Sequence, residues 1–186
     1  AGEPGSTTAG QDLTSVGGAG NVTVSAYDGY DNVKTDYVGT VVFTSTDGGG
    51  GGVLPGNYTF TGTGGDDGTH DFNRTGFTLA TAGNQTISAN DTVQTGIKAT
   101  TGAISVVADG IASFTLNAPA SVTAGVPFSL SVSGAVDGQG NAASGTIDVV
   151  FTDAGAHQAP DGTNPVLASI AVSGGSGSAN QTLVLA

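Results

Sequence analysis

The residues of this chain best suited to chemistry are aspartates and asparagines that cluster in glycine-rich segments. Because Ca²⁺ takes about six to eight oxygen ligands, loops dense in Asp, Asn and backbone carbonyls can bind it. The sequence therefore predicts Ca²⁺ as the candidate cofactor, although none of the loops is an EF-hand. The alternative is structural, since Asp and Asn side chains also accept backbone hydrogen bonds in turns. The candidate ligands are Asp28, Asp31, Asn32, Asp66, Asp67, Asp137 and Asn141.

Side chains that could carry out catalysis are few and separated. Cysteine is absent, and the two histidines, His70 and His157, lie in different halves of the chain. His70 falls beside Phe72 in a strand pattern, which predicts a packed structural histidine, whereas His157 falls in a loop and is expected to be exposed. With no Trp and 4 Tyr, the chain offers few aromatic walls for a sugar-cleaving cleft. The sequence predicts that the protein is not an enzyme.

Two covalent modifications are compatible with the sequence. The glycosylation pattern Asn-x-Ser/Thr marks surface positions in secreted proteins. Lys34 could form a side-chain isopeptide bond if it were buried beside an Asn and an acid, but a solvated lysine is the simpler expectation. The possible glycosylation sites are Asn21, Asn57, Asn73, Asn84, Asn90 and Asn180.

The charge balance excludes one class of partner. The net charge is −12 with only 3 Lys and Arg, and phosphate contacts need basic side chains, so no nucleic-acid partner is predicted. An acidic surface favours solubility, because like charges repel.

No apolar run reaches the roughly 18 residues of a transmembrane helix, so no membrane span is predicted. The chain begins at Ala1 without a Met or a signal segment, which indicates a mature chain or an excised piece of a longer one.

The elements that must position these residues are short strands. Thr, Val, Ser and Gly dominate a chain that is poor in strong helix formers, and they favour strands and turns. Apolar residues alternate with polar ones, as at Val41 and Phe43, or at Leu130 and Val132, and Gly and Asp clusters separate the segments. Many short strands at this spacing predict an all-β sandwich or barrel.

The chain repeats itself in order. Three pairs of segments correspond, which indicates a tandem repeat with a boundary near Asp109-Gly110. The expected domains are residues 1–109 and a shorter 110–186. The corresponding pairs are Thr8-Ala9-Gly10 with Thr123-Ala124-Gly125, Asp28 and Asn32 with Asp137 and Asn141, and Gly39-Thr40 with Gly145-Thr146.

Further motifs give the first half a family resemblance. Residues 7–107 resemble the immunoglobulin-like repeats of large bacterial and archaeal cell-surface proteins, whereas the second half departs from that pattern after Asp153. The resemblance implies two tandem immunoglobulin-like β-sandwiches and an extracellular, cell-surface location. It is carried by Thr8-Ala9-Gly10, Asp28 with Asn32, residues 39–47, Leu54-Pro55 with Tyr58 and Phe60, Gly68 with His70 and Phe72, and Thr81-Ala82-Gly83.

The two ends of the sequence leave two explanations open. The second module begins with a strand predicted at Ser113–Asn117, for which the first module has no room, and the chain stops at Ala186 without a closing strand like that at 103–107. The chain is either cut from a longer array or completed by donor-strand exchange, in which 1–6 is a terminal segment or donor strand for a neighbour. The predicted partners are copies of itself or adjacent repeats of the same chain.

Two functions follow from these patterns. The first is a structural module of an extracellular microbial surface assembly, such as a filament, stalk or adhesin shaft, acting by strand-mediated mechanical continuity. The alternative is a binding module, either an adhesin tip or the accessory domain of a carbohydrate enzyme, that recognises glycan or protein through loop ends such as 47–54.

Overall fold

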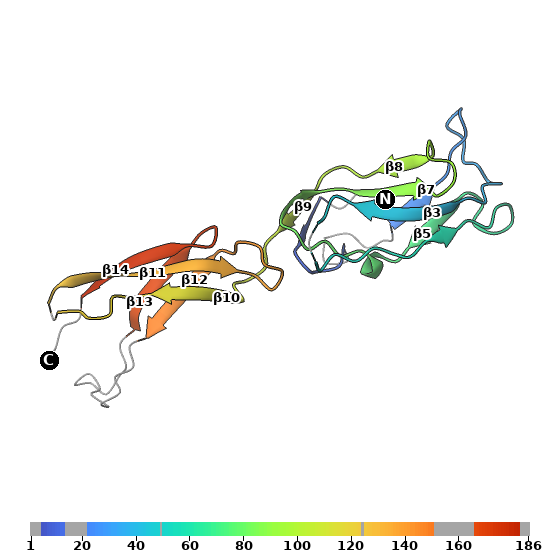
Figure 1. Ribbon diagram of the computed structural model, residues 1–186. Coiled ribbons are helices and arrows are strands. Elements are labelled where there is room, and N and C mark those ends of the chain that lie inside the picture. Colours follow the sequence, from blue (N-terminus) through green and yellow to red (C-terminus); the bar gives the residue numbers. More distant parts are fainter. Residues whose placement is uncertain (1–4, 14–21, 49, 124, 151–165, 183–186) are drawn as a thin grey trace. The chain divides into compact units, whose positions relative to one another are not determined.

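The computed structural model describes residues 5–13, 22–48, 50–123, 125–150 and 166–182, without the side chains of residues 166–168. It divides into two compact units, Ala1–Val107 and Ala108–Ala186. In the described ranges every named element is a strand apart from a 3₁₀ turn, η2, at Arg74–Gly76, so the all-β prediction is confirmed (Figure 1). None of these residues forms a helix that is both apolar enough and long enough to span a membrane.

The first unit is a pair of facing sheets built from nine described strands. One sheet has the order β4-β3-β7-β8, and β1-β9-β6 continues it, because β6 and β7 are separated only by Thr86. The pair β2-β5 forms the opposite layer. The strands are β1 (Ser6–Thr8), β2 (Val22–Ser25), β3 (Thr40–Ser45), β4 (Tyr58–Thr59), β5 (Thr69–Phe72), β6 (Gly83–Gln85), β7 (Ile87–Asp91), β8 (Lys98–Thr100) and β9 (Ile104–Val107).

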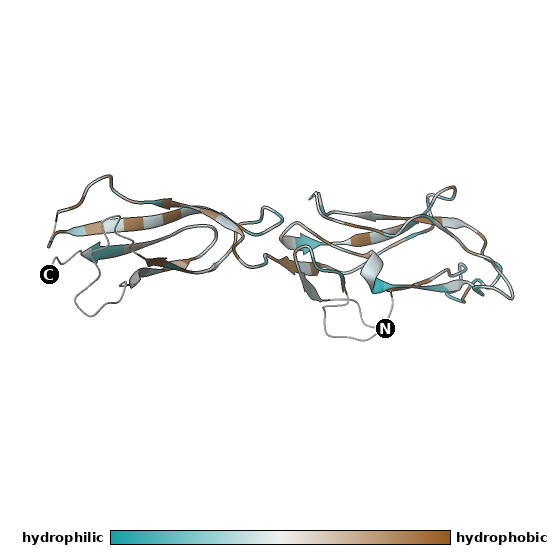
Figure 2. Ribbon diagram, turned by 90° about the horizontal axis from the view of Figure 1, so that it is seen from below, coloured by the Kyte–Doolittle hydropathy of each residue, from teal (hydrophilic) through white to brown (hydrophobic). Residues whose placement is uncertain are grey.

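Alternation along the strands builds the core between these layers. In β3, Val41 and Phe43 are buried, and the intervening Val42 is only half-buried. The Phe43 ring makes edge-to-face contacts with Phe72 of β5 at 4.8 Å and with Phe77 at 5.2 Å between centroids. Such aromatic pairs add to the free energy gained by burial alone. Figure 2 shows hydrophobic and hydrophilic bands alternating along several strands.

The second unit has the same sheet pairing with fewer described strands. The sheet β10-β11-β14 and the pair β12-β13 enclose a small core of Leu130, Val132, Ala135, Ile170 and Val172. Within β11 the alternation breaks between Val132 and Ala135, where Gly134 has φ +60°; an extra residue of this kind is a β-bulge. The strands are β10 (Ser113–Asn117), β11 (Pro127–Val136), β12 (Gly145–Val150), β13 (Val166–Val172) and β14 (Gly177–Thr182).

Matching hydrogen bonds identify corresponding strands in the two units. Ala26 N–H donates to Gly68 O at 2.8 Å, and Ala135 N–H donates to Gly175 O at 2.9 Å. Gly68 leads into β5 and Gly175 into β14, so β2 corresponds to β11 and β5 to β14. By the same connectivity β3 corresponds to β12 and β4 to β13. Among the described strands, β6 to β9 have no counterpart in the second unit, and β10 has none in the first.

Candidate functional site

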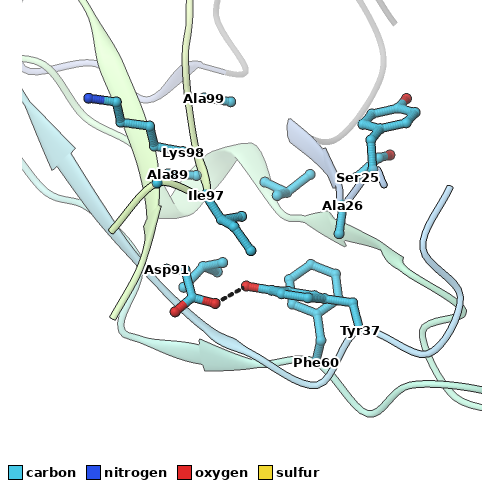
Figure 3. Close-up of a pocket in the computed structure, with 13 residues that line it drawn as sticks. Ser25, Ala26, Tyr37, Phe60, Ala89, Asp91, Ile97, Lys98 and Ala99 are labelled. Carbon is cyan, nitrogen blue, oxygen red and sulfur yellow. Dashed lines mark hydrogen bonds between the residues drawn. The ribbon is translucent and has the colours of Figure 1, made fainter. Parts of the chain in front are cut away.

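A groove in the first unit separates β2 from β7 and β8. Two adjoining cavities of about 340 and 280 Å³ make it up. Figure 3 shows Ser25 and Ala26 on one side of it and Ala89, Ile97 and Ala99 on the other. The residues common to both cavities are Val24, Ser25, Tyr27, Ala89 and Ala99.

A buried hydrogen bond closes one end of this groove. Tyr37 Oη donates to Asp91 Oδ2 at 2.5 Å, and Asp91 Oδ1 accepts from the backbone N–H groups of Val93 and Gln94, each at 2.7 Å. These hydrogen bonds, that from Tyr37 first, lower the pKa of Asp91. Burial, followed by the hydrogen bond to Asp91, raises the pKa of Tyr37. Gly39 is required beside the pair, because a Cβ there would lie 2.3 Å from Asp91 Oδ2.

The groove suits apolar side chains better than a polar ligand. Its described lining is mostly aliphatic and aromatic, and Asp91 and Lys98 are the only charged residues in it. Both Asp91 oxygens accept protein hydrogen bonds, and these bonds lower its pKa, which makes the carboxylate a weak base. The lining therefore favours binding of apolar side chains through shape and burial.

The loop that contains Asp28, Asp31 and Asn32 is a hydrogen-bonded turn. Asp28 Oδ1 accepts from Tyr30 N–H at 2.8 Å and from Asn32 N–H at 3.0 Å, and the Asn32 and Tyr30 backbone bonds lower its pKa. Asp31 takes the left-handed conformation at φ 64°, which Asp tolerates better than most residues. Asp28 thus acts as the acceptor that holds this turn together.

Asp137 and Asn141 form the same turn in the second unit. Asp137 Oδ1 accepts from Gln139 N–H at 2.9 Å and from Asn141 N–H at 2.8 Å, and Asp137 Oδ2 accepts from Asn141 Nδ2 at 2.9 Å and Asp109 N–H at 3.1 Å. Asp137 is only 3% exposed. Burial by itself raises the pKa of this carboxyl, but the four hydrogen bonds outweigh it and lower the pKa.

Asp66 is the centre of a third polar cluster. Its oxygens accept from the Thr61 backbone N–H at 2.7 Å and from Tyr58 Oη at 2.9 Å, and His70 Nδ1 lies 2.8 Å from Asp66 Oδ1. The His70 ring stacks on Tyr58 with 3.8 Å between centroids, which makes it a packed residue. Asp67 Oδ1 accepts from Gly64 N–H at 2.8 Å in the same turn.

The seven predicted calcium ligands therefore lie in three separate loops. Within the described ranges, no group of three or more His, Asp or Glu side chains is placed to hold a metal ion. In each loop at least one carboxylate already accepts turn hydrogen bonds, which supports the structural role. Calcium binding stays a prediction, which a thermal melt with calcium against a chelator tests.

The remaining predicted residues are distributed over the surface. Lys34 Nζ lies 2.8 Å from Asp36 Oδ1, and its side chain is 42% exposed, so it lacks the burial that an isopeptide bond needs. Asn57, Asn84 and Asn180 are exposed. Asn73 is also exposed and caps η2 through its side chain, whereas Asn90 is half-buried and donates to Thr44 Oγ1. His157 and Asn21 lie outside the described residues.

Sequence reasoning did not find the groove or the Tyr37–Asp91 pair. The two residues are 54 positions apart, and neither belongs to a local pattern that marks a site.

Comparisons with protein-family models, curated proteins and solved structures yield no match for this chain. The resemblance to immunoglobulin-like surface repeats therefore stays a prediction, and function has to be inferred from the geometry.

Proposed function

We propose that this chain is a structural, non-enzymatic module of an extracellular microbial surface assembly, such as a filament, stalk or adhesin shaft. In this proposal its units are two tandem immunoglobulin-like sandwiches, and its partners are copies of itself or adjacent repeats. The shared turn and sheet pairing of the two units support tandem repetition. The role we assign is to carry tension along hydrogen-bonded strands.

The observation that carries the proposal is the pairing of the terminal strands in the first unit. β1 runs parallel to β9, with Ser6 opposite Ser105 and Thr8 opposite Val107. Ser105 N–H donates to Gly5 O at 3.1 Å, and Ala9 N–H donates to Val107 O at 2.8 Å. The strand that begins the unit is thus bonded directly to the strand that ends it.

Parallel pairing determines how this unit would respond to tension. In a parallel pair, the N-terminal end of β1 and the C-terminal end of β9 lie at opposite ends of the ladder. Pulling them apart shears the ladder, so that its hydrogen bonds share the load instead of breaking one after another. A short ladder loaded in this way resists extension, which is what a shaft requires.

Single-molecule pulling on the chain, held between reference domains, tests this function. We expect a force peak for the first unit that releases roughly 350 Å of contour length, since each residue spans at most about 3.6 Å. Thr7 lies between the two bonded positions, so Thr7→Pro should lower the peak force by removing an N–H that faces β9.

Ser6→Pro is the matched control for this measurement. Alternate residues of a strand direct their backbone groups to opposite edges, so Ser6 N–H faces away from β9 and the peak force should be kept. Equal forces for the unmodified chain and both variants would show that the β1–β9 ladder carries no load, and the proposed function would fail.

One cavity in the first unit favours the binding-module alternative. A cavity of about 310 Å³ is lined by residues from both ends of the 47–54 loop, including Asp47 and Leu54. Asp47 accepts the backbone N–H groups of Ala80 at 2.6 Å and Thr81 at 3.0 Å, which anchors the start of this loop. Saturable binding on a glycan array, lost when the loop is shortened, would favour this function over the structural one.

A further inference from the structure

In the second unit a strand, β10, occupies an edge that no described strand of the first unit covers. β10 pairs antiparallel with β11, with Leu116 opposite Val132 and Asn117 opposite Ser131. The corresponding strand of the first unit, β2, pairs with β5 on one edge only. On its other edge, no strand is found among the residues that the structure describes. The groove between β2 and β8 lies at this open edge.

The backbone of β2 can accept a strand there. Ala26 N–H is bonded to Gly68 O, on the side of β5. Because alternate residues of a strand direct their backbone groups to opposite edges, Val24 also faces β5, and Thr23 and Ser25 face the open edge. The side chains of Thr23 and Ser25 bond to Asp71 and Thr69 of β5, which holds β2 in place.

The side chains around this edge specify the kind of strand. Alternate positions of an added strand would point into the groove, whose walls include Val22, Val24 and Ala26 on one side and Ala89 and Ala99 on the other. Burying a large apolar side chain in such a groove is favourable, because it removes apolar surface from water. An extended segment with apolar residues at every second position is the complementary partner.

Charge also limits which strands can bind in the groove. The chain carries a net charge of −12, so an acidic strand would be repelled from it. The groove lining contains one acid, Asp91, whose oxygens are occupied, and one base, Lys98. β10 itself, Ser-Phe-Thr-Leu-Asn, carries no charge. An uncharged strand of this type can dock without electrostatic cost.

We propose that the groove between β2 and β8 is an acceptor site for a β-strand supplied by another polypeptide chain. The strand is uncharged, carries apolar side chains at alternate positions as β10 does, and pairs antiparallel with the Thr23–Ser25 edge of β2. This mode of binding is β-strand addition. The inference rests on the proposed function and deepens it, because it names the contact through which one module would be joined to the next.

Peptide binding to the full chain tests the acceptor site. The probe is a labelled peptide with the sequence of residues 112–118, Ala-Ser-Phe-Thr-Leu-Asn-Ala, and binding is followed by fluorescence anisotropy. We expect saturable binding that weakens about tenfold or more when Phe and Leu of the peptide are replaced by Ser. Amide hydrogen exchange should slow at Thr23 and Ser25 when the peptide binds.

Two protein variants locate the binding. Ala99→Asp places a charge in the groove at an exposed position of β8 and should abolish peptide binding. Val93→Asp adds the same charge at a side chain that is 84% exposed and does not line the groove, so binding should be unchanged. Circular dichroism of both variants confirms that they fold.

Three outcomes would overturn the acceptor site. They are no saturable binding by the unmodified chain, equal binding by the Ala99→Asp and Val93→Asp variants, and unchanged hydrogen exchange at Thr23 and Ser25. If the peptide fails to bind while Thr7→Pro still lowers the peak force, the acceptor site is wrong and the structural function stands. If the force peak does not depend on β1, the structural function fails whatever the peptide does.

Discussion

At the scale of single residues, several aspartates of this protein act as hydrogen-bond acceptors. Asp28, Asp66, Asp91 and Asp137 each accept at least two backbone or side-chain hydrogen bonds. A carboxylate that accepts several hydrogen bonds stabilises its charged form. The acidic composition is therefore partly a set of turn acceptors, as the structural alternative to calcium predicted.

Asp66 makes the stability of the first unit depend on pH. Partial burial raises the pKa of Asp66, but hydrogen bonds from the Thr61 backbone, His70, the Thr61 hydroxyl and Tyr58 outweigh it and lower the pKa from 3.8 to about 2. A lowered folded-state pKa means that the ionised group stabilises the fold above the unfolded-state pKa. This contribution is complete above about pH 4 and disappears as the pH falls to about 2.

The measurement is the melting temperature of the first unit as a function of pH. Asp66→Asn removes the charge, so the melting temperature of the variant should fall less steeply than that of the unmodified chain between about pH 4 and pH 2. The other aspartates leave a residual slope in both proteins. Identical slopes would show that Asp66 does not contribute in this pH range.

At the scale of elements, one glycine sets the geometry where β5 begins. Gly68 has φ +77° and accepts a hydrogen bond from Ala26, and a Cβ there would lie 2.4 Å from the Lys34 carbonyl oxygen. In the second unit Gly175 has φ +86° and accepts from Ala135. The left-handed conformation and the close backbone together exclude a side chain at this point of the turn.

Gly68→Ala should therefore destabilise the first unit by about 1–3 kcal/mol, the cost of a strained backbone conformation, with the contact adding to it. Gly56→Ala is the control, because its Cβ would meet no atom within 4 Å and its φ is not positive. Urea denaturation gives both free energies of unfolding. Similar values for the two variants would mean that the turn relaxes without cost.

The strands themselves were predicted well where alternation is regular. Val41 with Phe43, His70 with Phe72, Ser113–Asn117 and Leu130 with Val132 all fall in strands, as does most of the strand predicted at 103–107. β1 was not predicted as a strand, because three residues of Ser and Thr carry no alternation. Of the segment 1–6, which was predicted as a terminal segment or donor strand, residues 1–4 lie outside the described residues, and Ser6 pairs with Ser105 of its own unit.

At the scale of the whole molecule, the two units differ in the side chains that form their hydrophobic cores. Among the described residues, the first unit buries five large side chains almost completely: Leu13, Phe60, Phe77, Leu79 and Ile104. In the described part of the second unit the buried core residues are aliphatic, with no buried aromatic ring, and Phe114 and Leu116 of β10 remain 45% and 43% exposed. Each large apolar side chain that is fully buried contributes about 1.5–3 kcal/mol relative to an exposed one.

We therefore expect the units to unfold in two steps. Residues 1–107 and 108–186, expressed separately, should show a higher urea midpoint for the first than for the second, and the full chain should show both transitions. Circular dichroism during urea titration provides the measurement. One transition in the full chain, with matching midpoints for the separate units, would contradict this expectation.

The sequence by itself determined the all-β class, most strand positions and the matching Asp-x-x-x-Asn turns, because alternation and turn chemistry depend on residues a few positions apart. Only the tertiary structure decided that β1 joins β9, that Tyr37 meets Asp91 and that a groove opens beside β2. These features bring together residues separated by 50 positions or more. Which strands become neighbours depends on how the layers pack around a shared core, and no local pattern specifies that choice.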